Sequence, residues 1–233
     1  MSRRIAARAG ITGLIGATVL YAGLRGVRHN ELDRELLTAV KRADARGVRS
    51  ALARGADPNA RGGTPDPWWD VSAKPADITA VLHPTALALL FARSNVYRAD
   101  GSVLPENMTC LKELLDRGAD PNVITSDDAT QPVLIRAARA GYGASVRAML
   151  DHGANPNVVD SRGANALSDA VYSNDVQTAV SLIQHGVDVN ARFRGGTALD
   201  WAIHYHHPKM VALLRYYAKG DGGKSAAGGV IGK

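Results

Sequence analysis

The chain contains a single cysteine, Cys110, among its 233 residues. One thiol cannot form an intrachain disulfide, and it excludes every zinc or iron–sulfur site that needs several cysteines. Aromatic residues are also scarce, at 5% of the chain, which is too few for a core built like an immunoglobulin sandwich. Cys110 falls on the apolar side of a predicted helix, so we expect a buried and inert thiol.

Acidic residues are absent from residues 1–30, which contain five arginines. These arginines and the basic residues of 219–233 account for the formal net charge of +6, and they leave a net charge of −1 on residues 31–218. Nucleic-acid binding needs lysines and arginines concentrated on one face, because its affinity comes from neutralising phosphates. The balanced body therefore predicts no nucleic-acid partner.

An uncharged run from Ala9 to Leu24 approaches the length of a membrane span, and arginines flank it on both sides. A span needs about 20 apolar residues, with roughly 17 as the lower limit. No good small-x-small cleavage site follows the run. We therefore predict that residues 1–28 form an uncleaved signal anchor or a signal peptide, with the membrane contact at residues 9–24. The arginine count places the N-terminus in the cytoplasm, and the remaining chain in a periplasm if the source is bacterial.

Three other interpretations of this segment stay open. The start at residues 2–5 partly resembles a twin-arginine signal, although Ala6-Ala7 stands where a hydrophobic pair should follow. An arginine-rich, acid-free start also resembles a mitochondrial presequence. A buried core helix is disfavoured, because the run contains several glycines that weaken a soluble helix.

The body of the chain repeats a short motif. Gly-Ala-Asp-Pro-Asn occurs at residues 55–59 and 118–122, and close variants occur at 153–157 and 186–190. A leucine-rich stretch with helical spacing precedes each copy, and a proline or another turn residue follows the glycine. The sequences Thr-Ala-Leu-Ala-Leu-Leu at 85–90 and Thr-Ala-Leu-Asp-Trp-Ala at 197–202 begin further helices. With a period near 33 residues, these motifs resemble those of ankyrin repeats.

The resemblance implies an all-α ankyrin-repeat solenoid of helix–turn–helix pairs with hairpin loops over residues 29–218, preceded by a hydrophobic N-terminal helix. Residues 219–233 are expected to form a flexible glycine-rich tail. The expected repeats have the approximate bounds 31–61, 83–124, 129–159, 162–191 and 194–218. Such a domain is expected to be monomeric, and its repeats bury their leucines only by stacking on one another.

Two insertions, at residues 62–82 and 94–107, lengthen the second repeat. The first contains Trp68 and Trp69, and two adjacent tryptophans are unusual in a flexible loop. Insertions in solenoids lie in loops, often on the binding face. The two tryptophans therefore fold back as a small local core, or at least one of them is an exposed anchor for a partner.

Motifs for chemistry are weak. Gly222-Gly223-Lys224-Ser225 resembles the end of a phosphate loop, but Ala218 stands where the first glycine belongs and a helix precedes it instead of a strand. His204, His206 and His207 suggest a metal site, but His206-His207 aligns with the turn between two ankyrin helices. No nucleophile, acid–base pair or metal cluster converges. We therefore predict no enzyme activity, no cofactor and no metal.

Ankyrin repeats imply protein binding through the hairpin tips and the exposed positions of the first helices. The leading hypothesis is a membrane-anchored or exported adaptor, inhibitor or accessory protein that binds one protein partner. The alternatives are an immunity protein against a secreted toxin, a mitochondrial or cytosolic scaffold, or a structural spacer. The predicted partner-binding residues are Trp68, Trp69, Arg93, Arg139, Arg162, Tyr172, Phe193, Arg194, His204 and Tyr205.

Overall fold

The computed structural model describes residues 31–61, 84–92, 107–125 and 131–218. Within them, ten helices form five successive pairs. The first helices of the pairs are residues 31–41, α4 (Ala86–Leu90), α7 (Val133–Arg139), α9 (Ala166–Tyr172) and α11 (Ala198–His204). The second helices are α2 (Ala45–Ala53), α6 (Met108–Asp116), α8 (Gly143–Asp151), α10 (Val176–Gln184) and α12 (Pro208–Ala218).

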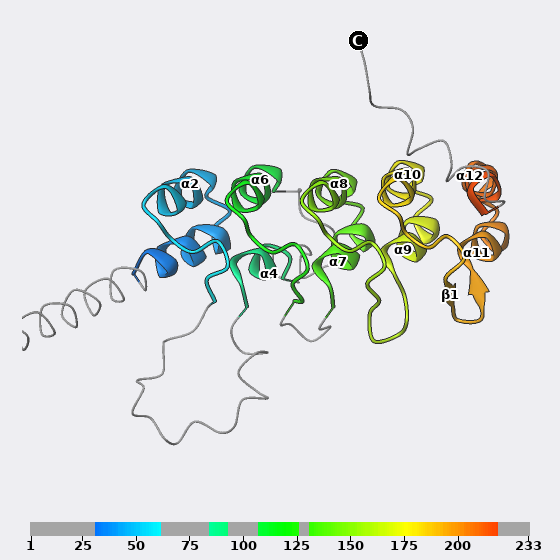
Figure 1. Ribbon diagram of the computed structural model, residues 1–233, viewed down its shortest axis with the longest axis horizontal. Coiled ribbons are helices and arrows are strands. Elements are labelled where there is room, and N and C mark those ends of the chain that lie inside the picture. Colours follow the sequence, from blue (N-terminus) through cyan, green and yellow to red (C-terminus); the bar gives the residue numbers. More distant parts are fainter. Residues whose placement is uncertain (1–30, 62–83, 93–106, 126–130, 219–233) are drawn as a thin grey trace, which may run out of the picture.

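The pairs stack side by side into a two-layered solenoid, with the second helices in one row and the first helices in the other (Figure 1). Each helix packs mainly on its own partner and on its counterparts in the neighbouring pairs. A hairpin of strands β1 (Arg192–Phe193) and β2 (Gly196–Thr197) precedes α11, and it projects from the row of first helices (Figure 1). The predicted all-α solenoid is confirmed.

Three of the short first helices begin at side-chain caps, whereas α7 follows Pro132 without one. The side chain of Thr85 accepts a hydrogen bond from the backbone N–H of Ala88, and Asn165 and Thr197 begin α9 and α11 with reciprocal capping boxes. A cap satisfies backbone donors that the first turn leaves without partners. These helices span five to seven residues in α4, α7, α9 and α11, which is too short for independent stability in water. Their stability therefore comes from packing against the neighbouring pairs.

The turns use residues with a left-handed backbone at fixed places. The predicted helix-ending glycines have positive φ, for example 86° at Gly118. Within three of the pairs, the turn residue is Gly141, Asn174 or His206, with φ of 75°, 56° and 57°. His206 therefore occupies the position that a glycine fills two pairs earlier, which confirms that it belongs to the turn between the helices.

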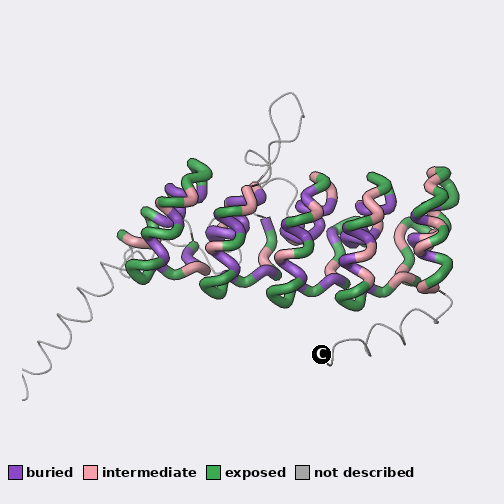
Figure 2. Tube along the Cα trace, turned by 90° about the horizontal axis from the view of Figure 1, so that it is seen from above, coloured by how far each residue is buried: buried purple, intermediate pink, exposed green. Residues whose placement is uncertain are grey.

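The core is one continuous cluster of leucine, valine and alanine side chains running through all five pairs. Buried positions lie where successive helices face each other, and exposed positions lie at the turns (Figure 2). Equivalent positions show how far this core depends on neighbours. Val171 in α9 is fully buried, whereas Ile203, which occupies the equivalent place in α11, is 47% exposed at the end of the described stack.

A ladder of asparagines joins the loops of adjacent pairs. Asn157 Nδ2 donates to the carbonyl of Gly186 (3.1 Å), and its Oδ1 accepts from the N–H of Asp188 (2.8 Å). Asn59 and Asn122 bond to the next loop in the same way. At the start of the described stack, Asp33 accepts from the N–H of Asp57 and so replaces a preceding asparagine. The repeated motif is therefore the hydrogen-bonded seam of the solenoid.

The described residues that flank the two predicted insertions keep regular repeat geometry. Arg61 and Thr85 form an antiparallel bridge across the first insertion, and Asn107, the last residue of the second, caps α6. The insertions themselves, with Trp68 and Trp69, lie outside the described residues except for Asn107. The predicted membrane contact at residues 9–24 and the tail at 219–233 also lie outside them. No helix in the part of the chain that the structure describes is long and apolar enough to cross a membrane.

Removing one ladder asparagine should destabilise the solenoid. Asn157→Ala removes both bonds to the following loop, and we expect a loss of about 1–2 kcal/mol in the free energy of unfolding. Asn190→Ala is the matched control, because the side chain of Asn190 forms no such bond to the described residues. Chemical denaturation followed by circular dichroism measures both losses. Equal losses in the two variants would contradict the role of the ladder.

Candidate protein-binding surface

Aromatic side chains gather on the last two pairs of the described stack. We call Tyr172, Phe193, Trp201, His204 and Tyr205 the aromatic surface. Tyr172 from α9 meets Tyr205 edge to face across the two pairs, with ring centroids 5.5 Å apart. Trp201 stacks on Tyr205 at 5.9 Å and meets His204 edge to face at 5.6 Å. Such arrangements stabilise aromatic pairs beyond the area that they bury, so the rings support one another in fixed positions.

The hairpin is fastened to this surface through Trp201. Its indole Nε1 donates to the carbonyl of Phe193 at 2.9 Å, and the two rings lie 6.5 Å apart. A Cβ on Gly196 would lie 3.1 Å from the same indole nitrogen, a close contact that would require the indole to shift by a few tenths of an ångström. At the hairpin tip, the guanidinium of Arg194 lies 5.1 Å from the centre of the Phe193 ring. The hairpin therefore presents both an aromatic ring and a cation.

Exposure separates this cluster from the core. Tyr172 is 70% exposed, the largest fraction among the exposed large hydrophobic side chains in the described residues. His204 is exposed, and Phe193, Trp201 and Tyr205 are partly buried. Partly buried, mutually packed aromatic rings beside an exposed tyrosine are typical of binding hot spots.

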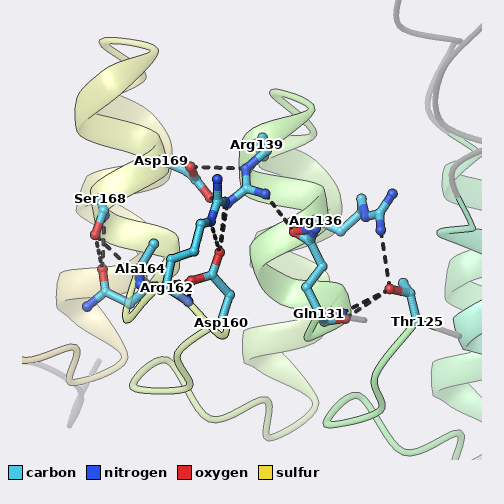
Figure 3. A network of polar contacts seen from close by, with 10 residues as sticks. Thr125, Gln131, Arg136, Arg139, Asp160, Arg162, Ala164, Ser168 and Asp169 are labelled. Atoms are coloured by element: carbon cyan, nitrogen blue, oxygen red, sulfur yellow. Dashed lines mark hydrogen bonds and ion pairs between the residues drawn. The ribbon is translucent and has the colours of Figure 1, made fainter. Parts of the chain in front are cut away.

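A network of arginines and aspartates joins α7 to α9 and to the loop that precedes α9 (Figure 3). Arg139 reaches three partners at once: Gln131 Oε1 (2.9 Å), Asp160 Oδ2 (3.2 Å) and Asp169 Oδ1 (3.3 Å). Arg162 binds the same Asp160 oxygen through Nη2 at 2.8 Å. Asp169 lies one helical turn before Tyr172 on α9. The network thus fixes the loop before α9 to the preceding pair.

The two aspartates of this network differ in how well they are satisfied. Burial raises the pKa of Asp160, but hydrogen bonds from Arg162, from the backbone of Ala164 and Arg162, and from Arg139 outweigh it and hold the pKa at about 2. Burial also raises the pKa of Asp169, and the attraction to Arg139 does not offset it. Asp169 Oδ2 lies 3.2 Å from Arg139 Nη2 but accepts no hydrogen bond from the described residues.

The predicted binding residues divide into three groups. Tyr172, Phe193, His204 and Tyr205 come together in the aromatic surface, with Arg194 beside them. Arg139 and Arg162 lie in the adjoining network, where their side chains are 29% and 51% exposed. Their guanidinium groups bind aspartates within the protein and so stabilise the fold. Sequence reasoning placed both arginines at exposed positions and did not predict these internal contacts. The remaining three, Trp68, Trp69 and Arg93, lie outside the described residues.

Trp201 is the central residue that sequence reasoning missed. It falls within the Thr-Ala-Leu-Asp-Trp-Ala motif, whose spacing suggests a core position. A signal was present, because the same place in the two preceding pairs holds Asp169 and Arg136. Arg136 is buried and the side chain of Asp169 is only 15% exposed, so the signal at this position is the replacement of charged side chains by an aromatic one and not surface exposure.

Other reactive groups show no convergence in the described part of the chain. Cys110 is fully buried, and burial raises the pKa of its thiol, as expected for an inert side chain. Among the described residues, no group of three or more His, Cys, Asp or Glu side chains is placed to hold a metal ion. An open hollow of about 540 Å³ lies along the second helices and includes Lys112, Arg147 and Asp175 in its lining. None of the predicted binding residues lines it.

The fold and the surface define a class: a helical-repeat solenoid that presents a rigid aromatic face. A family model described as ankyrin repeats matches three copies in the chain, over residues 103–193 and 134–222. These matches together span just over half of the 233 residues. The chain belongs to the ankyrin repeat family, whose members are generally protein–protein interaction modules and typically non-catalytic. No curated protein sequence matches it.

Neutralising Asp160 should destabilise the domain more than neutralising Asp169. We expect Asp160→Asn to cost about 2 kcal/mol at neutral pH, because the low pKa measures how strongly the fold favours the charged carboxylate. Asp169→Asn should cost less, since burial already disfavours its charged form. Chemical denaturation of the two variants and the wild type provides the comparison.

The pH dependence of the unfolding free energy tests whether the effect of Asp160→Asn comes from the charge of Asp160. A carboxylate with a lowered pKa stabilises the fold fully above its ordinary value of 3.8, and this stabilisation disappears as the pH falls to about 2. The difference in unfolding free energy between wild type and Asp160→Asn should therefore stay constant down to the ordinary pKa and shrink below it. A difference that persists unchanged at the acid end would contradict the assignment.

Proposed function

We propose that this protein is a non-catalytic adaptor, inhibitor or accessory protein that binds one protein partner through the aromatic surface. One observation supports this most directly. Four predicted binding residues from the last two pairs lie together: Phe193, His204 and Tyr205 pack around Trp201, and Tyr172, the most exposed large hydrophobic side chain described, packs on Tyr205. Tyr172 is 70% exposed, so it contributes little to the buried core. Tyrosine and tryptophan are enriched among the interface residues that supply most of the binding energy.

Rigidity supports the same proposal. The rings contact one another, and the hydrogen bond from Trp201 to Phe193 holds the hairpin in place. Asp160 and its two arginines fix the neighbouring loop. A preformed surface loses little conformational entropy when a partner binds. The solenoid therefore offers its aromatic rings at a low entropic cost.

We further propose that residues 9–24 attach the protein to a membrane and that the solenoid lies outside the cytoplasm. The support is the uncharged run between arginines in the sequence. An immunity protein that blocks a secreted toxin would have the same layout, and the partner's identity separates it from an accessory factor. A mitochondrial location is the alternative for the same arginine-rich segment.

Removing two tyrosines should abolish partner binding without unfolding the domain. We expect Tyr172→Ala combined with Tyr205→Ala to lose the partner that the wild type recovers from source cells, because each removes a ring of the aromatic surface. Tyr216→Ala is the matched control. Tyr216 is 54% exposed and meets Tyr217 edge to face at 5.0 Å, but it lies on α12, away from the surface.

Quantitative mass spectrometry of the purified complexes gives the readout, and thermal unfolding checks each variant. A partner retained by the double variant, or lost equally in the Tyr216 control, would refute the assigned surface.

Disrupting the apolar run should release the protein from the membrane. We expect full-length protein to remain in the pellet after carbonate washing. Leu14→Asp with Val19→Asp should move it to the soluble fraction, because each charge near the centre of a span costs about 2.5–3.5 kcal/mol. Leu14→Ile with Val19→Ile is the control and should stay in the pellet. Soluble wild-type protein, or a mature N-terminus after residue 22, would overturn the anchor.

A further inference from the structure

Exposed arginines lie on the segments that lead into the two first helices of the aromatic surface. Arg162, Arg192 and Arg194 are exposed on the two hairpins that precede α9 and α11, and we call these three residues the arginine rim. Arg192 and Arg194 form no ion pair with any carboxylate in the described part of the chain. Arg194 instead lies over the Phe193 ring, where its N–H groups remain available at the edge of the guanidinium.

The carboxylates nearby are already engaged within the protein. The side chain of Asp160 is only 4% exposed and binds both Arg139 and Arg162. The side chain of Asp169 is 15% exposed beside Arg139. Asp200 is exposed, but its Oδ2 accepts hydrogen bonds from the N–H and the hydroxyl of Thr197, both at 2.8 Å. The carboxylates thus serve caps and loops, and hydrogen bonds from Thr197 together with the nearby charge of Arg192 lower the pKa of Asp200. The guanidinium groups of the arginine rim are exposed and remain accessible to a partner.

We propose that the partner segment bound by the aromatic surface is acidic, with an aromatic or aliphatic side chain flanked by aspartates or glutamates. This proposal rests on the proposed function and names the chemistry of its partner. The apolar side chain packs among Tyr172, Trp201 and Tyr205, and the flanking carboxylates bind the arginine rim. Arginine suits this role because its planar fork matches a carboxylate with two parallel hydrogen bonds.

A peptide fits this surface better than a nucleic acid. Residues 31–218 carry almost balanced charge in the sequence, with a net −1. Nucleic-acid affinity grows with the number of phosphates neutralised, and it needs a basic track longer than one hairpin tip and its neighbour. Charge around an aromatic centre instead matches a short acidic segment with one anchoring side chain.

The test compares two peptides that differ only in charge. One carries a central phenylalanine flanked by glutamates, and the other carries the same phenylalanine flanked by lysines. We expect the full chain to bind the glutamate peptide at least about tenfold more tightly, with affinity that falls as salt rises. Arg192→Glu combined with Arg194→Glu should reverse this preference. Isothermal titration calorimetry measures each affinity.

A second charge-reversal variant controls for net charge. Arg147→Glu with Arg215→Glu changes the total charge equally, but both residues are exposed on the second helices α8 and α12. This variant should keep the wild-type preference. An equal response in both variants would overturn the proposal, as would equal binding of both peptides, no binding of either, or tighter binding of a single-stranded oligothymidylate. The tyrosine variants decide separately whether the aromatic surface binds a partner, so this proposal can fail while the proposed function stands.

Discussion

A short helix pair cannot bury its own leucines, and this constraint governs the whole protein. First helices of five to seven residues have no independent stability, so each depends on the pair before and after it. The asparagine ladder adds hydrogen bonds between the loops that follow the first four pairs, with both the side-chain oxygen and the side-chain nitrogen of Asn157 engaged at one junction. Stability is therefore a property of neighbouring contacts, and a defect at one junction weakens the pairs on both sides.

The same constraint separates structural from binding residues along the first helices. Interior pairs are covered on both sides, and their polar first-helix residues are used internally. Arg139 and Asp169 stand next to exposed positions, but they hold the loop at Asp160 in place. In the fifth pair, aromatic side chains occupy the corresponding places: Trp201 where α9 has Asp169, and His204 where α9 has Tyr172. The change from charged to aromatic side chains along the stack produces the aromatic surface on the last two described pairs.

Much of this fold was predictable because its strongest determinants are local and repeated. A glycine after each leucine-rich helix indicates a left-handed residue that ends the helix, and a threonine before a first helix indicates an N-terminal cap. Both features depend on only a few neighbouring residues. The contacts of the candidate site are different in kind. Arg139 faces outward by its position in a helix, yet three partners from other segments engage it. The spacing of its motif suggests a core position for Trp201. Its position at the centre of the aromatic surface depends on contacts with Tyr205 and with the hairpin, which the motif does not show.

The aromatic surface spans the last two helix pairs that the structure describes. Ile203 is 47% exposed where the equivalent Val171 is buried, because no described helix pair covers the outer side of α11. Trp201 and Tyr205 stack on each other in the last described pair, and Tyr172 extends the cluster onto the preceding pair. A rigid interior with internally satisfied charges supports a terminal face that combines aromatic area with arginines, which are the two properties that concentrate binding energy at protein interfaces.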